Sequence, residues 1–454
     1  MGVKRFFVDP HGCAKNQVDG ETLISVLQRS GWVYCTDPEE ADLLIINSCG
    51  FIESAKRESI EAVLSYKSVY PDKKILLAGC LAQRYGQQLA EELTEADAFF
   101  GNTDLSRIAE AAERAIQGQH SVLLPPLDAT GKADFALCSE ERPLLSLPGS
   151  AYVKITEGCD NHCTYCSIPL IRGNLRSRPI DSIVSECKGL LHRGVRELCL
   201  IGQDLGSYGK DGAAGTLTPG ECRLSELLTA LSALKGEFWI RLLYIHPDNF
   251  PQDILPICQR DPRILPYFDI PFQHGSERIL RMMNRRGNKD IYLSLLDTIR
   301  SALPDATIRS TFLVGFPGET ETDMEILLDF QQKAQLDWLG VFTYSREEDT
   351  PAYTFKDRVP KRVAAERKSR IESAQGPITE QRMQRFVGKK LPVLVEEKVE
   401  NEEGLYIGRT LCQAPEVDGA TVITSDVPLT PGDIVTARVF ARSGIDLDSV
   451  YMME

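Results

Sequence analysis

The sequence contains no run of about 18 consecutive apolar residues, the length that a membrane-spanning helix requires. Residues 1–8 are followed by the acidic Asp9 and lack the long apolar core of a signal peptide. Low-complexity segments are absent, and 43% hydrophobic with 26% charged residues is an ordinary globular composition. We therefore expect a folded, cytoplasmic protein with no membrane partner.

The chain also lacks an excess of basic residues. Its 51 lysines and arginines stand against 65 aspartates and glutamates, which gives a net charge of −14. A surface of this charge repels bare nucleic acid. RNA binding would need a local basic patch, whereas a basic protein partner is accommodated more easily.

The 13 cysteines are an odd number in a chain without an export signal, which argues against a disulfide framework. Reduced cysteines of this kind are small buried hydrophobes, ligands or nucleophiles. Seven of them stand apart from the others, and we predict structural roles for Cys35, Cys138, Cys187, Cys199, Cys222, Cys258 and Cys412. The other six form two groups of three.

The pattern of apolar segments predicts an α/β multidomain protein. Residues 1–120 alternate strands and amphipathic helices, as in a doubly wound α/β domain with a parallel sheet. Residues 121–144 are rich in proline and predict a linker. Residues 145–375 contain six strand–helix units, too few for a complete TIM barrel but enough for a partial (β/α)6 barrel.

Residues 377–454 differ in character, because their apolar residues recur with period two. Turn residues such as those at 431–433 separate the expected strands. About 75 residues of this kind predict a small antiparallel β-barrel. The expected strands are 390–395, 405–410, 420–424 and 434–440.

The compact cysteine group is Cys159-Asp-Asn-His-Cys163-Thr-Tyr-Cys166, with Tyr165 before the last cysteine. It follows the first predicted strand of the partial barrel, at the end where such folds place their chemistry. Three neighbouring thiolates suit an iron–sulfur cluster or zinc. Zinc would need His162 as a fourth ligand, and the spacing leaves His162 little freedom to reach the same ion. A cluster bound by three cysteines leaves one iron open for a cofactor.

The dispersed group consists of Cys13, Cys49 and Cys80. Each is predicted just beyond the carboxyl end of a different parallel strand, where open α/β sheets bind their ligands. Read singly, each cysteine is a buried thiol of one strand–helix unit. Three cysteines at equivalent positions favour a second cluster. Glycines that allow a close approach of the backbone stand beside them at Gly12, Gly50 and Gly79.

The compact motif resembles the radical S-adenosylmethionine superfamily, and nearly the whole chain resembles the methylthiotransferases, whose final barrel is the TRAM domain. The resemblance depends on several motifs besides the two cysteine groups. They are Gly12-Cys13-Ala-Lys15-Asn16, Asn47-Ser-Cys49-Gly50-Phe51, Ile168-Pro169 to Arg172-Gly173, Arg176-Ser-Arg178-Pro179, Gln273-His-Gly-Ser276, Met283-Asn284-Arg285-Arg286 and Val314 to Thr320.

The family has one branch that modifies adenosines in transfer RNA and one that modifies an aspartate of ribosomal protein S-twelve of the 30S subunit. Residues 12–19, 49–55 and 414–419 resemble the second branch. Residues 386–454 contain six basic and twelve acidic residues, a balance that suits a basic ribosomal protein better than transfer RNA. A transfer-RNA methylthiotransferase is the alternative, and a non-catalytic ribosome-binding iron–sulfur protein is a more distant one.

The resemblance implies two 4Fe–4S clusters and S-adenosyl-L-methionine. One cluster carries the sulfur to be transferred, and the other cleaves S-adenosylmethionine to a radical that removes hydrogen from the aspartate β-carbon. No catalytic residue is expected beyond the cluster ligands. Electrons would come from a donor such as flavodoxin or ferredoxin, and no feature identifies the sulfur source. The implied metal ligands are Cys13, Cys49, Cys80, Cys159, Cys163 and Cys166, of which the last three also bind the cofactor.

Polar residues at the predicted strand ends are candidates for orienting S-adenosylmethionine, although each could be an ordinary core or rim residue. They are Gln203, Asp204, His246, Gln273 and Arg309. Three arginines after the compact motif could bind a carboxylate or form salt bridges, namely Arg172, Arg176 and Arg178. Because the cluster ligands lie in other domains, deleting residues 386–454 is expected to spare S-adenosylmethionine cleavage.

Overall fold

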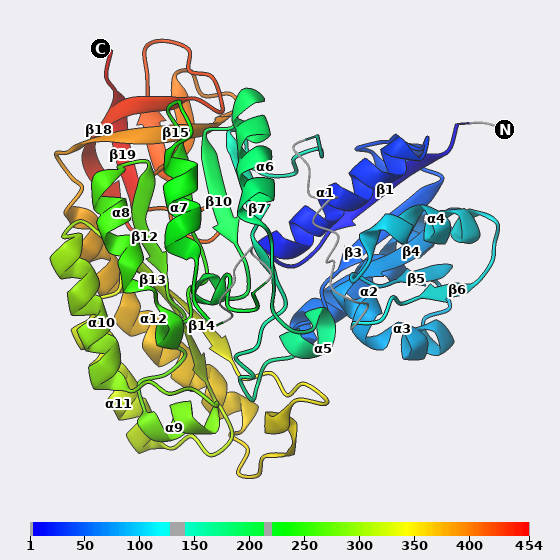
Figure 1. Cartoon of the computed structure of the whole chain (residues 1–454), viewed down its shortest axis with the longest axis horizontal. Helices are drawn as coiled ribbons and strands as arrows, with labels where there is room; N and C mark the ends of the chain where they lie inside the picture. Colours follow the sequence, from blue (N-terminus) through cyan, green and yellow to red (C-terminus); the bar gives the residue numbers. More distant parts are fainter. Residues whose placement is uncertain (1–2, 128–140, 213–219, 454) are drawn as a thin grey trace. The chain divides into compact units, whose positions relative to one another are not determined.

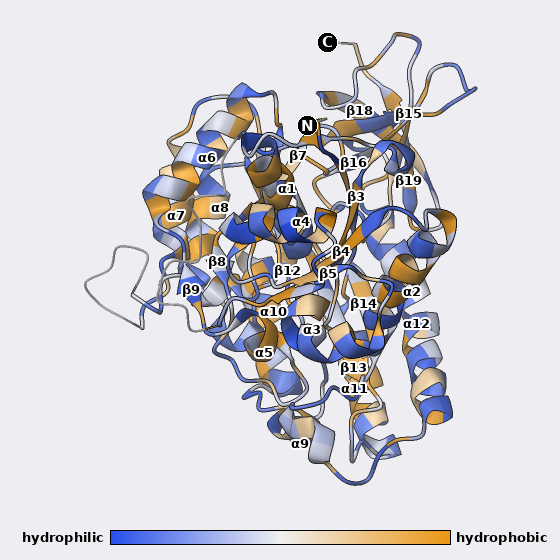
Figure 2. Ribbon diagram, turned by 90° about the vertical axis from the view of Figure 1, so that its right-hand side faces the viewer, coloured by the Kyte–Doolittle hydropathy of each residue, from blue (hydrophilic) through white to orange (hydrophobic). Residues whose placement is uncertain are grey.

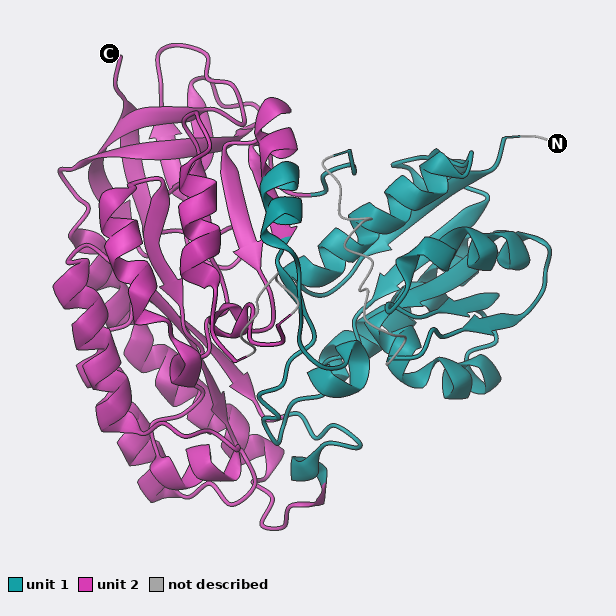
Figure 3. Ribbon diagram, viewed as in Figure 1, with its two compact units in different colours: residues 1–145, 154–186, 345–353 teal, residues 146–153, 187–344, 354–454 magenta. Residues whose placement is uncertain are grey.

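The structure, a computed structural model, describes residues 3–127, 141–212 and 220–453. Cys138 and residues 128–140 of the predicted linker lie outside these ranges. The chain divides into two compact units, coloured separately in Figure 3. Within the described ranges no helix is both long and apolar enough to cross a membrane. Unit 1 contains residues 1–145, 154–186 and 345–353, and unit 2 contains residues 146–153, 187–344 and 354–454.

Unit 1 contains a parallel six-stranded sheet of order β2-β1-β3-β4-β5-β6 (Figure 1). Its strands are β1 (Arg5–Pro10), β2 (Val33–Tyr34), β3 (Leu43–Ser48), β4 (Lys74–Gly79), β5 (Ala98–Phe100) and β6 (Ser121–Leu123). Its helices include α1 (Ala14–Arg29), α2 (Glu53–Val69), α3 (Cys80–Glu92) and α4 (Ile108–Ile116). The expected parallel sheet is confirmed, and β6 comes from the segment expected to be a linker.

Both faces of this sheet are buried at its central strands β3 and β4, which explains why these strands are largely apolar runs (Figure 2). Ile45 of β3 packs in one core with Leu23 of α1 and Ala111 of α4. The next residue, Ile46, packs in a second core with Val63 of α2. Helices therefore cover both faces, as a doubly wound domain requires.

Unit 2 contains the expected partial barrel, a six-stranded sheet of order β14-β13-β12-β11-β10-β7. The strands are β7 (Ser150–Lys154), β10 (Glu197–Ile201), β11 (Trp239–Leu242), β12 (Ile264–Asp269), β13 (Thr307–Val314) and β14 (Trp338–Thr343). Its helices include α7 (Leu224–Ser232), α8 (Leu255–Arg260), α9 (Glu277–Met282), α10 (Lys289–Ala302) and α11 (Glu321–Ala334). Helix α6 (Ile180–His192) runs from unit 1 into unit 2.

The long helix α12 (Lys361–Gln384) leads to a closed barrel of five strands, in the order β15-β16-β17-β19-β18. Residues 375–377, where the sequence predicts a domain boundary, lie inside α12, which contains Pro377. The fifth strand, β19, was not among the expected strands, and its parallel pairing with β17 departs from the antiparallel pattern. The strands are β15 (Lys390–Lys398), β16 (Leu405–Thr410), β17 (Thr421–Thr424), β18 (Ile434–Ser443) and β19 (Asp446–Tyr451).

Within unit 2, the five-stranded barrel packs on the amino ends of the partial-barrel strands. Arg409 of β16 forms a buried ion pair with Glu197, the first residue of β10 (2.6 Å). The indole of Trp338, the first residue of β14, donates to the carbonyl of Cys412 (2.6 Å). The guanidinium of Arg241 donates to the carbonyl of Leu411 (3.0 Å). The ends opposite to those expected to bear the chemistry are therefore covered.

Candidate functional site: two groups of cysteines

The dispersed cysteines follow three neighbouring strands of the unit 1 sheet. Cys13 follows β1 and is the N-cap of α1. Cys49 directly follows β3, and Cys80 follows β4 as the first residue of α3. Since β1, β3 and β4 are adjacent and parallel, their carboxyl ends lie at one edge of the sheet. The expected strand-end positions are therefore observed.

Two glycines allow the turns that bear these cysteines to approach one another. Gly12 has a φ of 93°, and a Cβ placed there would lie 2.8 Å from the Cβ of Cys49 and 3.0 Å from its sulfur. A Cβ at Gly50 would lie 2.7 Å from the carbonyl oxygen of Cys80. Any larger residue at either position would push the cysteine turns apart.

The electrostatics of the three thiols are coupled. Burial, together with the neighbouring Cys80 and Cys13, raises the pKa of Cys49 to about 12, whereas Arg172 opposes the shift. Burial also raises the pKa of Cys80, again against Arg172. The thiols of Cys49 and Cys80 therefore resist ionisation by themselves, and a metal centre that binds thiolates would have to displace their protons.

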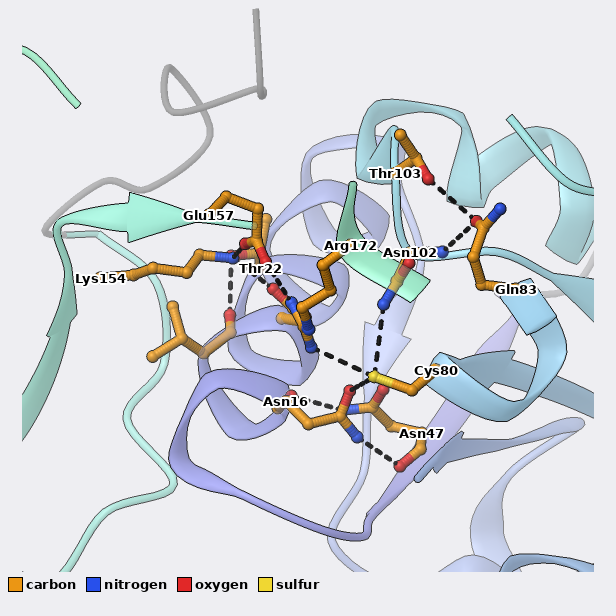
Figure 4. Close-up of polar contacts among 12 residues, drawn as sticks. Asn16, Thr22, Asn47, Cys80, Gln83, Asn102, Thr103, Lys154, Glu157 and Arg172 are labelled. Atoms are coloured by element: carbon orange, nitrogen blue, oxygen red, sulfur yellow. Dashed lines mark hydrogen bonds and ion pairs between the residues drawn. The ribbon is translucent and has the colours of Figure 1, made fainter. Parts of the chain in front are cut away.

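Several polar groups converge on the sulfur of Cys80 (Figure 4). Nη2 of Arg172 and Nδ2 of Asn102 each lie 3.3 Å from Sγ and donate to it. The thiol itself lies 3.7 Å from Oδ1 of Asn16. The same Asn16 donates to the carbonyl oxygen of Asn47 (2.9 Å), which ties α1 to the end of β3. The position of Cys80 is thus defined by contacts from three segments.

The compact motif forms a tight loop, also in unit 1, after the short strand β8 (Thr156–Glu157). The amide of Cys159 donates to the carbonyl of Gly173 (3.2 Å), and the amide of Cys166 donates to that of Cys163 (3.0 Å). His162 is exposed and has a φ of 49°. All three cysteines are half-buried.

Two contacts connect this loop to other parts of unit 1. The hydroxyl of Ser167, directly after Cys166, lies 3.4 Å from the carbonyl of Phe51, two residues beyond Cys49. The amide of Ala352 donates to the carbonyl of Thr164 within the loop (2.9 Å). Both cysteine groups therefore belong to one compact unit.

Beside Cys80 lies a set of buried charges, of which only Arg172 was considered from the sequence as a possible salt-bridge residue. Asp19 of α1 pairs with Lys154 (2.5 Å) and with Arg172 (2.8 Å), and Glu157 pairs with the same two cations (2.7 and 2.8 Å). A further signal was Lys154, a charged residue at the end of a fully buried strand.

The candidates for orienting S-adenosylmethionine have different surroundings in unit 2. The amide atoms of Gln203, beyond the end of β10, are covered and have no hydrogen-bond partner within the described ranges. Asp204 instead accepts from the amides of Gly206 (2.9 Å) and His246 (3.0 Å). Burial, together with nearby arginines, lowers the pKa of His246 to about 2. The side-chain amide of Gln203 thus remains available for a ligand, whereas the carboxylate of Asp204 already accepts hydrogen bonds from nearby backbone amides.

The candidate arginines mostly form internal contacts. Arg309 is near the amino end of β13 and pairs with Asp269 (3.2 Å) and Asp418 (3.4 Å). Gln273, another candidate, lies beyond β12 with a φ of 67°. Arg178 is buried in an ion pair with Glu186, and Arg176 donates to the carbonyl of Arg172.

No three His, Cys, Asp or Glu side chains in the described part of the chain are arranged to bind a single metal ion. Ligands of one ion must all lie near 2 Å from the same point. The ligands of a multinuclear cluster bind different irons and stand farther apart. Three thiols, with glycines beside them, are the type of donor set that an iron–sulfur cluster takes.

Three family models match parts of this chain. Residues 5–101 match the uncharacterized protein family UPF0004, residues 153–330 match the radical SAM superfamily, and residues 387–450 match the TRAM domain. The ribosomal protein uS12 methylthiotransferase RimO of Treponema denticola is 48% identical over 98% of this chain and 100% of its own length. This chain belongs to the uS12 methylthiotransferase family. The RimO protein of Carboxydothermus hydrogenoformans is 40% identical over 99% of both chains.

Membership of the uS12 methylthiotransferase family confirms the resemblance inferred from the motifs, and it identifies the chain as a radical SAM methylthiotransferase. An iron–sulfur cluster and S-adenosylmethionine are the cofactors of that chemistry. A solved radical S-adenosylmethionine methyltransferase, TsrM of Kitasatospora setae, superposes with a TM-score of 0.57 over 78% of this chain and 74% of its own. At 14% identity this similarity concerns the fold alone.

Proposed function

We propose that this methylthiotransferase replaces a hydrogen on the β-carbon of one aspartate of ribosomal protein uS12 (S-twelve) by a methylthio group. The names of its relatives support this substrate, and they do not favour the transfer-RNA alternative. An unactivated C–H bond carries no acidic proton, so a general base cannot open it at neutral pH. When bound, the clusters and S-adenosylmethionine supply the radical, the methyl group and the sulfur.

We further propose that two 4Fe–4S clusters bind, one at each group of cysteines. The observation that carries this proposal is the placement of Cys13, Cys49 and Cys80 at the ends of three adjacent strands. The compact loop offers three more half-buried thiols in the same unit. Gln203, with its unused amide, is the strongest candidate for a contact to S-adenosylmethionine.

We propose a domain organisation with an N-terminal domain at 1–120, a linker at 121–144, a radical SAM core at 145–375 and a TRAM domain at 377–454. We place the enzyme in the cytoplasm, where uS12 is made. Its electron donor would be a flavodoxin or a ferredoxin.

The decisive experiment offers the anaerobically reconstituted full-length enzyme both uS12 and adenosine-modified transfer RNA under identical reducing conditions. We expect uS12 alone to gain one methylthio group in place of hydrogen, located on aspartate by mass spectrometry. The Cys163→Ala variant serves as the control, since it lacks a ligand of the compact group. Modification of the RNA alone would overturn the substrate and leave the two-cluster chemistry standing.

A further inference from the structure

Arg172 provides a direct contact between the two cysteine-bearing segments of unit 1. It is the last residue of α5 (Ile168–Arg172), the helix that begins two residues after Cys166. Its Nη2 nevertheless lies 3.3 Å from the sulfur of Cys80, which belongs to the other cysteine group (Figure 4). A buried arginine that donates to a thiol is unusual, because guanidinium groups ordinarily pair with carboxylates.

The guanidinium is fixed by two carboxylates. Nη1 donates to Glu157 and Nη2 donates to Asp19, both at 2.8 Å, and the arginine side chain is only 2% exposed. Lys154 lies between the same two carboxylates. Two cations and two anions therefore alternate in a closed ring, whose charges balance without any contribution from Cys80.

This balance determines what Arg172 offers to the sulfur. The two carboxylates already compensate the charge of Arg172, so its hydrogen bond to the Cys80 thiol is not required for charge balance. Nη2 donates to both Asp19 and Cys80. Asn102 adds a second, uncharged donor at the same distance. Two N–H groups therefore point at one sulfur, whereas no such arrangement is needed for a thiol that serves only as a core residue.

We propose that Arg172 is a positioning residue that orients the Cys80 sulfur and raises the reduction potential of a cluster bound at Cys13, Cys49 and Cys80, an inference that depends on the proposed second cluster. One-electron reduction adds negative charge to the cluster sulfurs. Hydrogen bonds to those sulfurs stabilise the reduced form. The contact also fixes α5, and with it the end of the compact loop, against a ligand of the other cluster.

The test uses the full-length chain with Cys159, Cys163 and Cys166 replaced by alanine, so that only the proposed cluster at the dispersed cysteines remains. Its midpoint potential is measured by a redox titration that follows the electron paramagnetic resonance of the one-electron-reduced cluster. We compare Arg172→Gln, Arg172→Lys and Asn102→Ala in this background. The matched control is Arg178→Gln, which also removes a buried, ion-paired arginine but one paired with Glu186.

We expect Arg172→Gln to make the midpoint potential more negative than that of the triple-alanine chain alone. Arg172→Lys and Asn102→Ala should each cause a smaller shift in the same direction. Arg178→Gln should leave the potential unchanged. Equal shifts in Arg172→Gln and Arg178→Gln, or no shift in either, would overturn the inference. If Arg172→Gln does not fold, the inference is tested with Arg172→Lys and Asn102→Ala. An unchanged midpoint potential in both of these variants would overturn the inference. Absence of any cluster from the triple-alanine chain would instead contradict the proposed function.

Discussion

The carboxylate of Asp418 accepts a hydrogen bond from the hydroxyl of Tyr267 at 2.6 Å. Asp418 precedes β17 in the five-stranded barrel, whereas Tyr267 belongs to β12 of the partial barrel. Burial raises the pKa of Asp418 to about 6, although Arg309 opposes the shift. Residues 414–419, which the sequence associates with one branch of the family, therefore include a residue that packs inside unit 2.

The substitution Glu197→Gln should destabilise unit 2. Glu197 is buried and accepts from Arg241 (2.7 Å) and Arg409 (2.6 Å). Its neutralisation removes the carboxylate charge that pairs with buried Arg241 and leaves Arg409 paired with Glu396 alone (2.6 Å). We expect a loss of roughly 3–5 kcal/mol in the free energy of unfolding. Chemical denaturation followed by tryptophan fluorescence measures it.

A matched control is Glu380→Gln, which breaks a more exposed pair with Arg442 next to the same barrel. Its expected cost is only about 0–1 kcal/mol. A comparable loss in both variants would show that burial of the Glu197 ion pairs does not increase their contribution to the free energy of unfolding.

The same residue predicts how stability depends on pH. Burial alone would raise the pKa of Glu197, but the charges of Arg409 and Arg241 outweigh it and lower the pKa to about 2 from an ordinary 4.5. Because the folded pKa is depressed, the stabilisation is complete above pH 4.5 and is lost as the pH falls towards 2. Unfolding free energies measured across this range should fall less steeply in Glu197→Gln than in the wild type.

Deletion of residues 386–454 should impair unit 2 as a whole, contrary to the expectation from the sequence that S-adenosylmethionine cleavage would be spared. The deletion removes Arg409 from Glu197 and Asp418 from Tyr267, which leaves buried polar groups unsatisfied. A lower unfolding midpoint and reduced formation of 5′-deoxyadenosine are the expected results. Full cleavage activity with an unchanged midpoint would restore the view of an independent module.

The two cysteine groups should differ in their effects on the reaction. Cys163→Ala should abolish 5′-deoxyadenosine formation, whereas Cys49→Ala should preserve cleavage and stop methylthio transfer. Anaerobic wild-type protein should contain about eight irons per chain, and each variant about four. Chromatography of the nucleoside and iron analysis measure the two effects. Equal loss of cleavage in two folded variants would contradict the separate roles.

The hairpin between β15 and β16 should contribute to binding of uS12. Glu402 and Glu403 are exposed there, beside Glu400, and face no ion-pair partner among the described residues. Reversing both to lysine should slow association with the basic ribosomal protein. The effect should be smaller at high salt, because salt screens exposed charges and the screening length is already only about 10 Å at 0.1 M. Binding kinetics at two salt concentrations measure this. The charge-matched control reverses two exposed glutamates of α12, Glu366 and Glu372, to lysine.

The sequence predicted most of the architecture because the relevant signals are local. Continuous apolar runs marked β3 and β4, and period-two alternation marked β16. Strand β19 was missed because Asp446 and Asp448 interrupt its pattern, although Leu447 and Ser449 alternate with them on the buried face.

The positions of the cysteines could also be predicted, since each follows a strand in the chain. The contacts between distant segments could not. Nothing local indicates that Arg172 would reach Cys80, ninety-two residues away in sequence, or that Arg309 would pair with a loop of the final barrel. Those contacts depend on tertiary packing. Packing, rather than the neighbouring residues in the sequence, determines which partner a charged side chain meets.

The position of β19 has a consequence for biosynthesis. It pairs with both β17 and β18, so the five-stranded barrel cannot close before residues 446–451 have been synthesised. Until then, the unpaired edges of those strands remain available for wrong pairing. Glu197 and Trp338 are made much earlier, yet their partners Arg409 and Cys412 belong to a barrel that closes only at this last step. Folding of unit 2 during translation can therefore be completed only after β19 has been synthesised.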